Sequence, residues 1–424
     1  MEVVLLFASF LVLLFLGVPV AFSLGISSAL YILYTGQSLL IMPQFMYVGM
    51  DSFVLLSIPG FILAGNLMSR GGITKYIIVL ANAFLGHIKG GLGLANIGSS
   101  MLMAGVSGTA VADVASSGAA MIPAMEKEGY DVDYACAISA ASSVIGAIKP
   151  PSVPLIVAGT VTGISVGGLF VAGIIPGFLI GFGLIAMAYY LAIKRDYPQL
   201  PKATWPERID AMKKSIWAIM MVVIMIGGII GGIFTPTEAA MVSVTYAFFI
   251  GLFVYKELKV KDIPAILVDS VVTSGAIILL VGFARVFAHI LTMEQIPQMI
   301  AAAILDISTN PIVILIIINL LLLFVGSFME TLSAILILFP VLLTVSRSVG
   351  IPDIQFATMA TMNLVLGLTT PPVGVVLFVA GGIGKISLAR IVKAMLPFYI
   401  VLFTVLLLVM FVPPITMFLP SLMN

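Results

Sequence analysis

The chain has 424 residues, of which 61% are hydrophobic and 9% charged, whereas a soluble domain carries about 25% charged residues. Its 19 basic and 18 acidic residues nearly cancel, which excludes a basic surface for nucleic acid. A single cysteine excludes an internal disulfide, and two distant histidines argue against a histidine-rich metal or catalytic site. Because the many glycines and prolines lie within hydrophobic segments, the sequence predicts an all-α polytopic membrane protein with interrupted helices.

Nine apolar runs are long enough for spanning helices, which need about 20 mostly apolar residues. They are 3–35, 52–69, 133–163, 168–193, 214–233, 236–255, 268–292, 356–384 and 391–417. Two further apolar stretches, 92–125 and 311–345, contain a polar or glycine-rich middle. The first run has no basic segment before it, so we do not expect a cleaved signal peptide there.

Basic residues predict the orientation of these spans. Six of the 19 lie between 193 and 215, and the positive-inside rule assigns this segment to the cytoplasm. The other basic clusters reach the same side only if 92–125 and 311–345 enter the membrane and return. We therefore expect these two stretches to be re-entrant helical hairpins. The clusters that this scheme places inside contain Arg70, Lys75, Lys89, Lys127, Lys256, Lys259, Lys261, Lys385, Arg390 and Lys393.

A shift of 221 positions aligns glycines and prolines in the two halves of the chain. The matched positions are Gly105 with Gly326, Gly146 with Gly367, Gly163 with Gly384, and Pro150-Pro151 with Pro371-Pro372. One constant offset that includes a Pro-Pro pair favours an internal duplication. The orientation scheme gives the two copies opposite topology, so we expect two inverted repeats.

Inverted repeats with broken helices are typical of secondary transporters, whose substrate and ion sites lie at the breaks. An unpaired backbone group in hydrocarbon costs several kcal/mol, so a break persists only where it lines a cavity or binds something. Four breaks combine glycine with hydroxyl residues, and their carbonyl and hydroxyl oxygens suit a hard cation such as sodium. Small residues and Ser or Thr also allow close helix packing, which is the alternative explanation. The candidate sodium-binding residues are Gly105, Ser107, Gly108, Gly146, Pro150, Gly326, Gly367, Thr369 and Thr370.

Charged residues within apolar segments are further candidates for the site. Glu330 is aligned with Thr109 in the repeat and either contacts substrate or a cation or caps a half-helix. Lys149 either attracts a carboxylate or forms a structural contact. Arg285 either binds a substrate carboxylate through both its nitrogens or belongs to a structural ion pair. Asp113 is expected to cap or pair within its hairpin.

The sequence resembles a known family, the large membrane subunit of tripartite ATP-independent periplasmic (TRAP) transporters. The resemblance covers essentially the whole chain, and its motifs are specific only in combination. The matching stretches are Ile58 to Met68, Gly105 to Asp113, Ile122 to Met125, Ala140 to Gly146, Pro150 to Pro154, and Phe234 to Ala240.

The resemblance implies sodium-driven uptake of a small organic acid across the bacterial inner membrane by an elevator mechanism. It implies two protein partners, a small membrane subunit carried on a separate chain and a periplasmic substrate-binding protein, and no ATPase. It also implies substrate contacts by Ser107, Ser152 and Glu330. Thr109, Lys149 and Arg285 are added as substrate-binding candidates. Lys149 departs from the apolar residue common in the family, which suggests a more acidic ligand.

The expected organisation divides the chain into a scaffold and a transport part. Residues 1–75 and 214–295 form the scaffold helices of the two repeats, and 196–213 form a cytoplasmic loop. Residues 76–195 carry hairpin 92–125 and broken helix 133–163, and residues 296–424 carry hairpin 311–345 and broken helix 356–384. The fold expected is therefore an elevator-type ion transporter.

Other functions fit the sequence less well. A stand-alone sodium-coupled carboxylate carrier of related fold, working without a binding protein, is the main alternative. A channel would not need two hairpins with ion sites. An enzyme would need a catalytic constellation that we do not find, and a primary pump would need a nucleotide-binding loop. We expect sodium as the coupling ion and no organic cofactor. Sialic acids, dicarboxylates and sugar acids all remain open as substrates.

Overall fold

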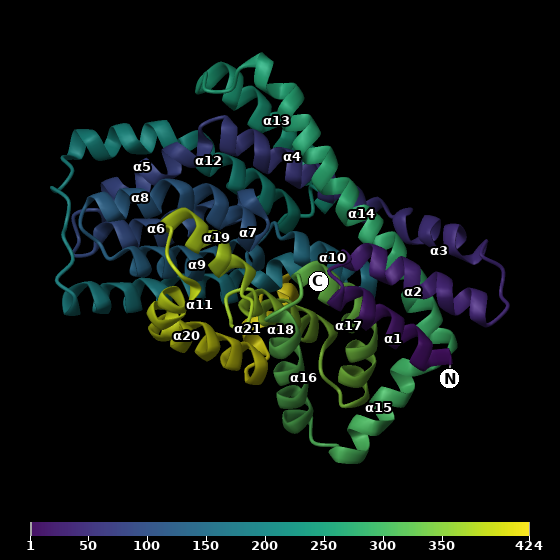
Figure 1. The fold of residues 1–424 in the computed structure, drawn as a ribbon. Coiled ribbons are helices and arrows are strands. Elements are labelled where there is room, and N and C mark those ends of the chain that lie inside the picture. The colour runs from purple at the N-terminus through teal and green to yellow at the C-terminus, as the bar shows by residue number, and fades with distance from the viewer. Residues whose placement is uncertain (1, 424) are drawn as a thin grey trace.

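The protein is helical throughout the part of the chain that the structure describes. A computed structural model describes residues 2–423, except for the side chains of residues 104–107, and contains no strand in this range (Figure 1). In the first half the helices are α1 Glu2–Phe15, α2 Val20–Tyr34, α3 Ile41–Met50, α4 Ser57–Arg70, α5 Ile73–Leu85, α6 Gly91–Ser107, α7 Ala110–Asp113, α8 Ala119–Lys127, α9 Val132–Ile148, α10 Val153–Thr162 and α11 Val166–Lys194. In the second half they are α12 Trp205–Ile230, α13 Pro236–Phe249, α14 Ile263–Met293, α15 Ile296–Ile307, α16 Pro311–Gly326, α17 Thr331–Ser348, α18 Asp353–Gly367, α19 Val375–Gly384, α20 Leu388–Phe411 and α21 Pro414–Met417.

Seven helices in the described residues are long and apolar enough to cross a membrane. They are Phe53–Arg70, α11, α12, Pro236–Val254, Val260–Met293, α17 and α20. The bent pair of α9 and α10 makes an eighth if it crosses as one span. Six of these seven helices correspond to the nine expected runs, whereas α17 lies in the stretch 311–345 that was expected as a re-entrant hairpin. Of the other three runs, 133–163 is the bent pair, and 3–35 and 356–384 are each divided into two shorter helices. The prediction of a multi-span helical membrane protein is confirmed.

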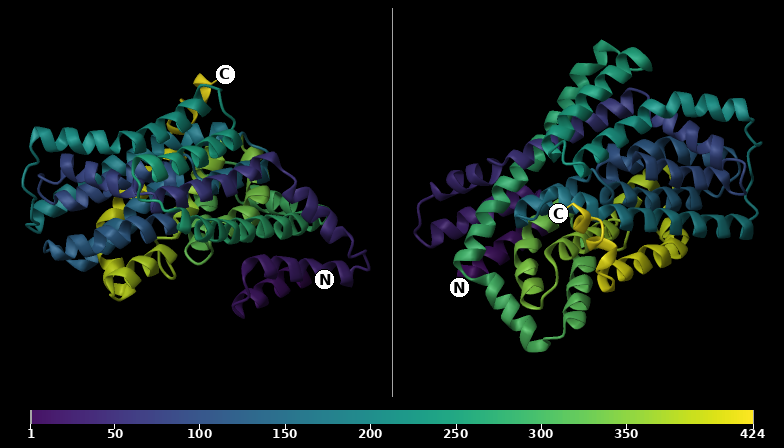
Figure 2. Two further views of the ribbon diagram at one scale, coloured as in Figure 1. Left: turned by 90° about the horizontal axis from the view of Figure 1, so that it is seen from above. Right: turned by 180° about the vertical axis from the view of Figure 1, so that it is seen from behind.

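The N-terminal run 3–35 is two helices, so the prediction of one span there is wrong. α1 ends at Phe15, and Gly17 in the connection has a φ of +81°. Pro19 immediately precedes α2, and proline disfavours helical backbone in the residue before it. The helix therefore cannot continue through this point. The two helices pack against each other at the edge of the molecule (Figure 2).

Loops and short helices also differ from the expectation. The segment expected as a loop over 196–213 becomes helical at Trp205, because Thr204 and Glu207 form a capping box at the start of α12. Three helices, α3, α5 and α15, were not expected at all. Each is shorter than a membrane crossing requires, so none of them contains an apolar run of spanning length.

Two helices are interrupted at their proline pairs, as the sequence predicts. α9 ends at Ile148 and α10 begins at Val153, with a bend of 40° between them. α18 ends at Gly367 and α19 begins at Val375, so the second interruption is longer. Proline lacks a backbone donor and restricts the preceding residue, so neither helix runs through its pair. Both proline pairs are joined by a cis peptide bond.

Ion pairs join distant basic segments at one end of the molecule, which we call the basic end. The pairs are Arg70–Asp269, Lys75–Glu257, Lys89–Asp196 and Arg195–Asp131. The hydrogen bond from Lys89 lowers the pKa of the Asp196 carboxyl. The segments joined in this way are those that the orientation scheme assigns to one side of the membrane, so the grouping of the basic residues agrees with the fold.

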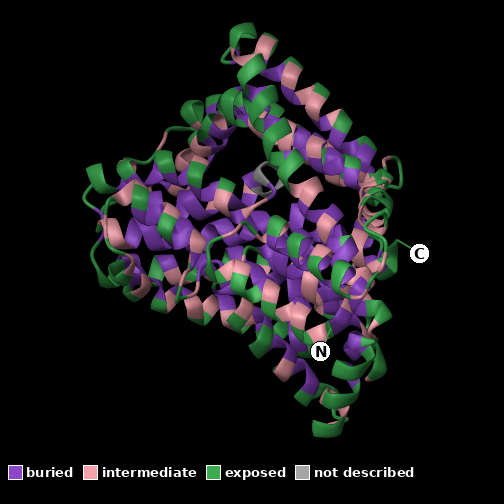
Figure 3. Cartoon of the chain, turned by 45° about the vertical axis from the view of Figure 1, so that its right-hand side comes forward, coloured by how far each residue is buried: buried purple, intermediate pink, exposed green. Residues whose placement is uncertain are grey.

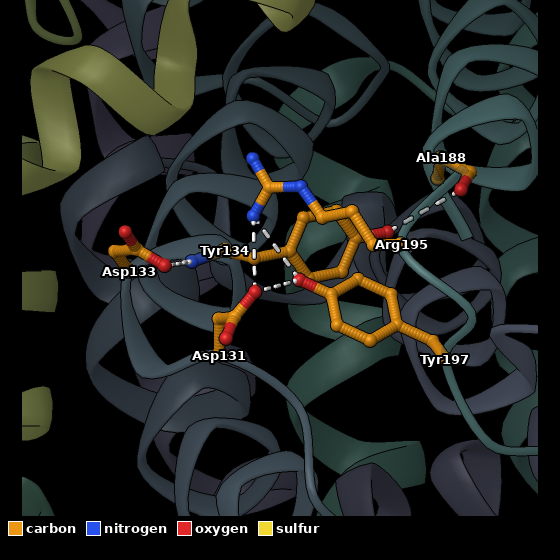
Figure 4. A network of polar contacts seen from close by, with 6 residues as sticks. All are labelled: Asp131, Asp133, Tyr134, Ala188, Arg195 and Tyr197. Atoms are coloured by element: carbon orange, nitrogen blue, oxygen red, sulfur yellow. Dashed lines mark hydrogen bonds and ion pairs between the residues drawn. The ribbon is translucent and has the colours of Figure 1, made fainter. Parts of the chain in front are cut away.

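A polar network at the basic end connects the start of α9 to the end of α11 (Figure 4). Arg195 donates hydrogen bonds of 3.2 Å to both Asp131 and the Tyr197 hydroxyl. The Tyr197 hydroxyl in turn donates to Asp131 at 2.7 Å. The ring of Tyr134 packs against that of Tyr197, with centroids 4.7 Å apart. The network fixes the place where the chain leaves α11 for the loop to α12.

The core is densest around α9 and α18, the first helices of the two interrupted pairs. Nearly all their residues are buried, and Figure 3 shows buried residues concentrated in the middle of the molecule. Two buried amides are paired there, since Asn96 donates to Ser139 at 2.7 Å and Asn363 donates to Asn319 at 2.7 Å. A second, smaller core lies among α4, α5, α12 and α13.

Candidate functional site

The turn between α6 and α7 is bonded to the first interrupted helix. The carbonyl oxygen of Gly108 accepts a hydrogen bond of 3.2 Å from the backbone nitrogen of Val153. Gly108 has a φ of +63°, a conformation that glycine adopts without steric cost. We call this contact the first junction. It connects the expected tip of hairpin 92–125 to the start of α10.

The turn between α16 and α17 is bonded in the same manner to the second interrupted helix, and we call this contact the second junction. The carbonyl oxygen of Ser327 accepts hydrogen bonds of 3.2 Å from the nitrogens of Val373 and Gly374. Gly367 lies directly against Gly326, and a Cβ on Gly367 would be 2.4 Å from the carbonyl carbon of Gly326. Only glycine at 367 permits this approach.

Hydroxyl and carbonyl oxygens gather at the second junction. Thr369 and Thr370 each donate through Oγ1 to the carbonyl oxygen of Leu366 at 2.8 Å. The Tyr399 hydroxyl donates to the carbonyl oxygen of Thr369. These uncharged oxygens belong to the class of ligand that hard cations prefer, and unwound helices commonly supply them to sodium. The residues at this junction therefore fit the expected ion.

Two helix N-termini begin beside the junctions, and each is capped by an expected site residue. Ser152 donates to the carbonyl oxygen of Ala147, and its Oγ accepts from the nitrogen of Leu155 at 3.3 Å at the start of α10. Glu330 Oε2 accepts from the nitrogens of Leu332 and Ser333 at 2.9 and 3.1 Å at the start of α17. Glu330 thus caps a half-helix, which is one of the two roles predicted for it from the sequence. α10 and α17 pack against each other, so two partly positive helix ends lie in one region.

Thr109 lines a cavity of about 200 Å³ that extends toward the basic end. Its Oγ1 caps α7 by accepting from the nitrogen of Ala112 at 3.3 Å. Asn66, Thr74 and Thr273, from α4, α5 and α14, supply polar groups to the same cavity. Among the substrate candidates, Thr109 is therefore the one that faces a cavity between the junctions and the basic end.

Lys149 is buried in the first interruption. Its Nζ donates to the carbonyl oxygen of Met101 on α6 at 2.9 Å and lies 4.3 Å from the centroid of the Phe178 ring on α11. Gly177 leaves room for its side chain, since a Cβ there would be 3.1 Å from Lys149 Cβ. These contacts match the structural interpretation of Lys149.

Arg285 lies in a different place from the other candidates. It lines a cavity of about 340 Å³ between α3 and α14 on one side and α10 and α17 on the other. Neither junction contributes a residue to the lining of this cavity. Arg285 takes part in no ion pair among the described residues. The alternative prediction, that it belongs to a structural ion pair, is therefore not supported.

Asp113 is fully buried at the end of α7. The Ser100 hydroxyl of α6, in the same expected hairpin, lies close to its carboxylate. The prediction that Asp113 caps or pairs within its hairpin therefore stays a prediction.

The remaining sodium candidates divide between the two junctions. Gly146 and Pro150 are buried at the end of α9 near the first junction, and Gly326 is buried at the second. Gly105 and Ser107 fall within residues 104–107, whose burial and side-chain contacts are not described, so the predictions for them stay predictions. The sequence missed Thr160 and His289, which share the cavity with Arg285, because their neighbours are far apart along the chain.

Comparison with known proteins assigns the family. Residues 7–415 match the family described as tripartite ATP-independent periplasmic transporter, DctM component. The chain is 43% identical over 411 residues to the sialic acid TRAP transporter large permease protein SiaM of Vibrio cholerae, covering 97% of this chain and 96% of that protein. It is 37% identical over 445 residues to the C4-dicarboxylate TRAP transporter large permease protein DctM of the same species, covering 100% and 98%.

A solved structure shares the fold. The YdaH transporter of Alcanivorax borkumensis matches with a TM-score of 0.63 at 14% identity, over 90% of this chain and 86% of that one. The sequence relatives are transport permeases rather than enzymes. From the length of the family match and its identity to these permeases, we conclude that the chain belongs to the DctM family of TRAP transporters, as a multi-span large permease of the bacterial inner membrane.

Proposed function

We propose that this permease takes up a small organic acid across the inner membrane, driven by a sodium gradient through an elevator mechanism. The observation that carries the proposal is the pair of matched junctions, in which each hairpin turn bonds to the residues just after a proline pair. Such a junction supplies unwound carbonyl oxygens for a cation and helix N-termini for an anion. Both ligands of a sodium–acid symporter therefore have a suitable place.

Sodium binds at the two junctions in this proposal. At the first, the ligands come from residues 105–108 with Gly146 and Pro150. At the second, they come from Gly326, Gly367, Thr369 and Thr370. The absence of charge among these groups favours a monovalent ion that must bind and leave in each cycle, because carboxylate ligands would hold it more tightly.

The substrate binds between the two sodium sites. The N-termini of α10 and α17 attract its carboxylate, and Ser107, Thr109 and Ser152 supply hydrogen bonds. Glu330 turns one oxygen toward its own helix, which leaves the other for a hydroxyl or amine of the substrate. Lys149 acts as a positioning residue that holds α9 against α6. The relatives transport sialic acid and C4-dicarboxylates, so the substrate class is an organic acid.

The moving body comprises residues 76–195 and 296–424, and the scaffold comprises residues 1–75 and 214–295. The similar bonding at the two junctions supports an internal duplication, and the grouping of basic residues supports its inverted topology.

Two partners complete the transporter in this proposal: a small membrane subunit that enlarges the scaffold and a periplasmic protein that delivers the substrate. Membership of a tripartite family favours them over the alternative, a stand-alone sodium-coupled carboxylate carrier.

Uptake into proteoliposomes tests the proposal. The permease and its small subunit are reconstituted, an inward sodium gradient is imposed, and labelled sialic acid and succinate are supplied with and without the cognate binding protein. We expect uptake only when sodium and binding protein are both present. Uptake with sodium alone would select the stand-alone carrier, and uptake that is indifferent to sodium would contradict the coupling.

A further inference from the structure

The cavity that holds Arg285 is a built polar site and not a packing gap. Its volume is about 340 Å³, and Thr160, His289 and Thr292 line it together with Arg285. The His289 ring stacks on Phe45, with centroids 3.6 Å apart and an interplanar angle of 18°, which fixes its orientation. A cation, an imidazole and two hydroxyls thus face one space.

The neighbouring helix makes room for the arginine. A Cβ on Gly49 of α3 would lie 2.6 Å from Cβ and 2.8 Å from Cγ of Arg285. Glycine at this position lets α3 pass directly over the aliphatic part of the side chain. The guanidinium is therefore supported along its stem, while its five donors remain for a ligand.

The position of Arg285 makes an unoccupied guanidinium costly. It lies sixteen residues after Asp269, which pairs with Arg70 at the basic end, and this separation is about 24 Å along α14. A charge at that depth lies within the hydrocarbon zone and is stable only beside a partner or in a wet cavity. The described residues offer no carboxylate within ion-pair distance of Arg285.

The cavity is connected to the proposed substrate site by two helices. Thr160 is eight residues beyond Ser152 on α10, and Leu336 and Pro340 are six and ten residues beyond Glu330 on α17. Since both helices rise about 1.5 Å per residue, the cavity lies about 9–15 Å from their N-termini. It lies on the side away from the cavity of Thr109, which faces the basic end.

We propose that Arg285, with His289 and Thr160, forms a second anion site that receives the carboxylate of the substrate before it reaches the junctions. This inference rests on the proposed function. A guanidinium binds a carboxylate through two parallel hydrogen bonds, which makes Arg285 the anchor. The Thr160 and Thr292 hydroxyls donate to carbonyl oxygens of their own helices at 2.8 Å and turn from them to donate to the bound acid. Because α10 and α17 belong to the moving body and α14 to the scaffold, the site exists only while those surfaces are apposed. Movement of the body therefore releases the acid toward the junctions.

Chemical protection tests the site without any variant. The permease and small subunit are placed in phosphatidylcholine nanodiscs in sodium-free buffer and treated with phenylglyoxal, which modifies guanidinium groups. Peptide mass spectrometry measures the rate at Arg285 and, as an internal control, at the exposed Arg390 of the basic end. We expect succinate or sialic acid to slow modification of Arg285 about tenfold or more, the uncharged succinamide to have no effect, and Arg390 to be unaffected.

Two results would overturn the inference. One is an unchanged rate at Arg285 with both acids. The other is protection by phosphatidylglycerol in the nanodisc but not by the acids, which would assign the guanidinium to a lipid phosphate. Because the assay contains no sodium, it is independent of coupling. A wild-type protein that shows protection here but no sodium-driven uptake would contradict the proposed function and leave the anion site standing.

Variants then connect the site to transport. Arg285→Gln is expected to raise the KM for the acid about 10- to 100-fold, the range for a charge-assisted hydrogen bond. Arg285→Lys keeps the charge but loses the paired donors, and should recover only part of this loss. The sodium concentration for half-maximal uptake should stay unchanged in both, whereas a merely structural role would lower the maximal rate and leave the KM for the acid in place.

Discussion

The two junctions are built alike but differ in their surroundings. At the first, every residue from Ile145 to Gly159 is buried, and the interruption spans only four residues. At the second, the interruption spans seven residues, and Pro371 and Pro372 are exposed. The interrupted helix of the first junction is therefore enclosed by protein, while that of the second opens to the outside of the bundle.

The difference shows two ways of stabilising a broken helix in a membrane. The first junction uses a buried cation, Lys149, whose Nζ donates to a carbonyl oxygen of α6. The second uses close backbone contact between Gly326 and Gly367 together with threonine hydroxyls. An ion at the second junction can exchange with water more directly, since less protein covers it. The second junction should therefore be the more sensitive to small changes.

The largest effect is expected from Gly367→Ala. The added Cβ would be 2.4 Å from a backbone carbon, and backbone cannot move aside as a flexible side chain does. Overpacking of this kind costs about 1–3 kcal/mol, and here it also separates the proposed sodium ligands. We expect uptake to be abolished and the thermal midpoint to fall.

Gly382→Ala on α19 is the matched control, because nothing lies within 4 Å of the Cβ it would add. It should leave both uptake and the thermal midpoint near wild type. Equal behaviour of the two variants would mean that close contact at the second junction is not required.

A smaller effect is expected from Thr370→Val, which keeps the shape of the side chain and removes one hydroxyl. Losing one neutral ligand should weaken the binding free energy of sodium by about 1–1.5 kcal/mol, which raises the sodium concentration for half-maximal uptake about tenfold. Thr404→Val is the control, since Thr404 also donates to a carbonyl four residues earlier but lies exposed on α20. The proposed sodium site at the second junction fails if the two variants have the same sodium dependence.

Sequence alone predicted the interruptions well, because glycine and proline act locally on the backbone. The breaks at Pro150-Pro151 and Pro371-Pro372 and the start of α13 at Pro236 all follow from such local effects. Sequence failed where a long apolar run contained a turn, as between Phe15 and Val20. Apolar composition is the same for one long helix and for two short ones, so hydropathy could not separate them.

The surroundings of the charged residues were beyond sequence reasoning for a different reason. Lys149, Asp113 and Arg285 all stand in apolar segments, yet one contacts a carbonyl and a ring, one is fully buried, and one lines a cavity. Neighbours on other helices are as far along the chain as Phe178 is from Lys149, 29 residues, or Gly49 from Arg285, 236 residues, and no spacing along the chain encodes that proximity.

Lys149→Met should separate structure from substrate attraction at the first junction. Methionine fills a similar volume but cannot donate to Met101 or bind the Phe178 ring as a cation, a contact of about 2 kcal/mol when desolvated. Relief of the buried charge offsets part of the loss, so we expect destabilisation of about 1–2 kcal/mol. The KM for the acid should stay within about twofold of wild type, which corresponds to a change of about 0.4 kcal/mol or less in the binding free energy of the acid. A large rise in KM would instead support direct attraction of substrate by Lys149.

The smallest effect is expected at the basic end, from Arg195→Gln. Its partner Asp131 lies at the start of α9. The variant therefore tests whether α9 is held in place by the contacts at the first junction or by the exposed polar network at the basic end. The Arg195 and Asp131 side chains are 34% and 59% exposed, and pairs of this kind contribute about 0–1 kcal/mol. The thermal midpoint should fall slightly at low salt and match wild type at high salt, where ions screen the pair. A drop as large as that of Lys149→Met, persisting in high salt, would mean that the network and not the break anchors α9. The stability of the first junction would then depend on contacts at the basic end and not on its enclosure by protein.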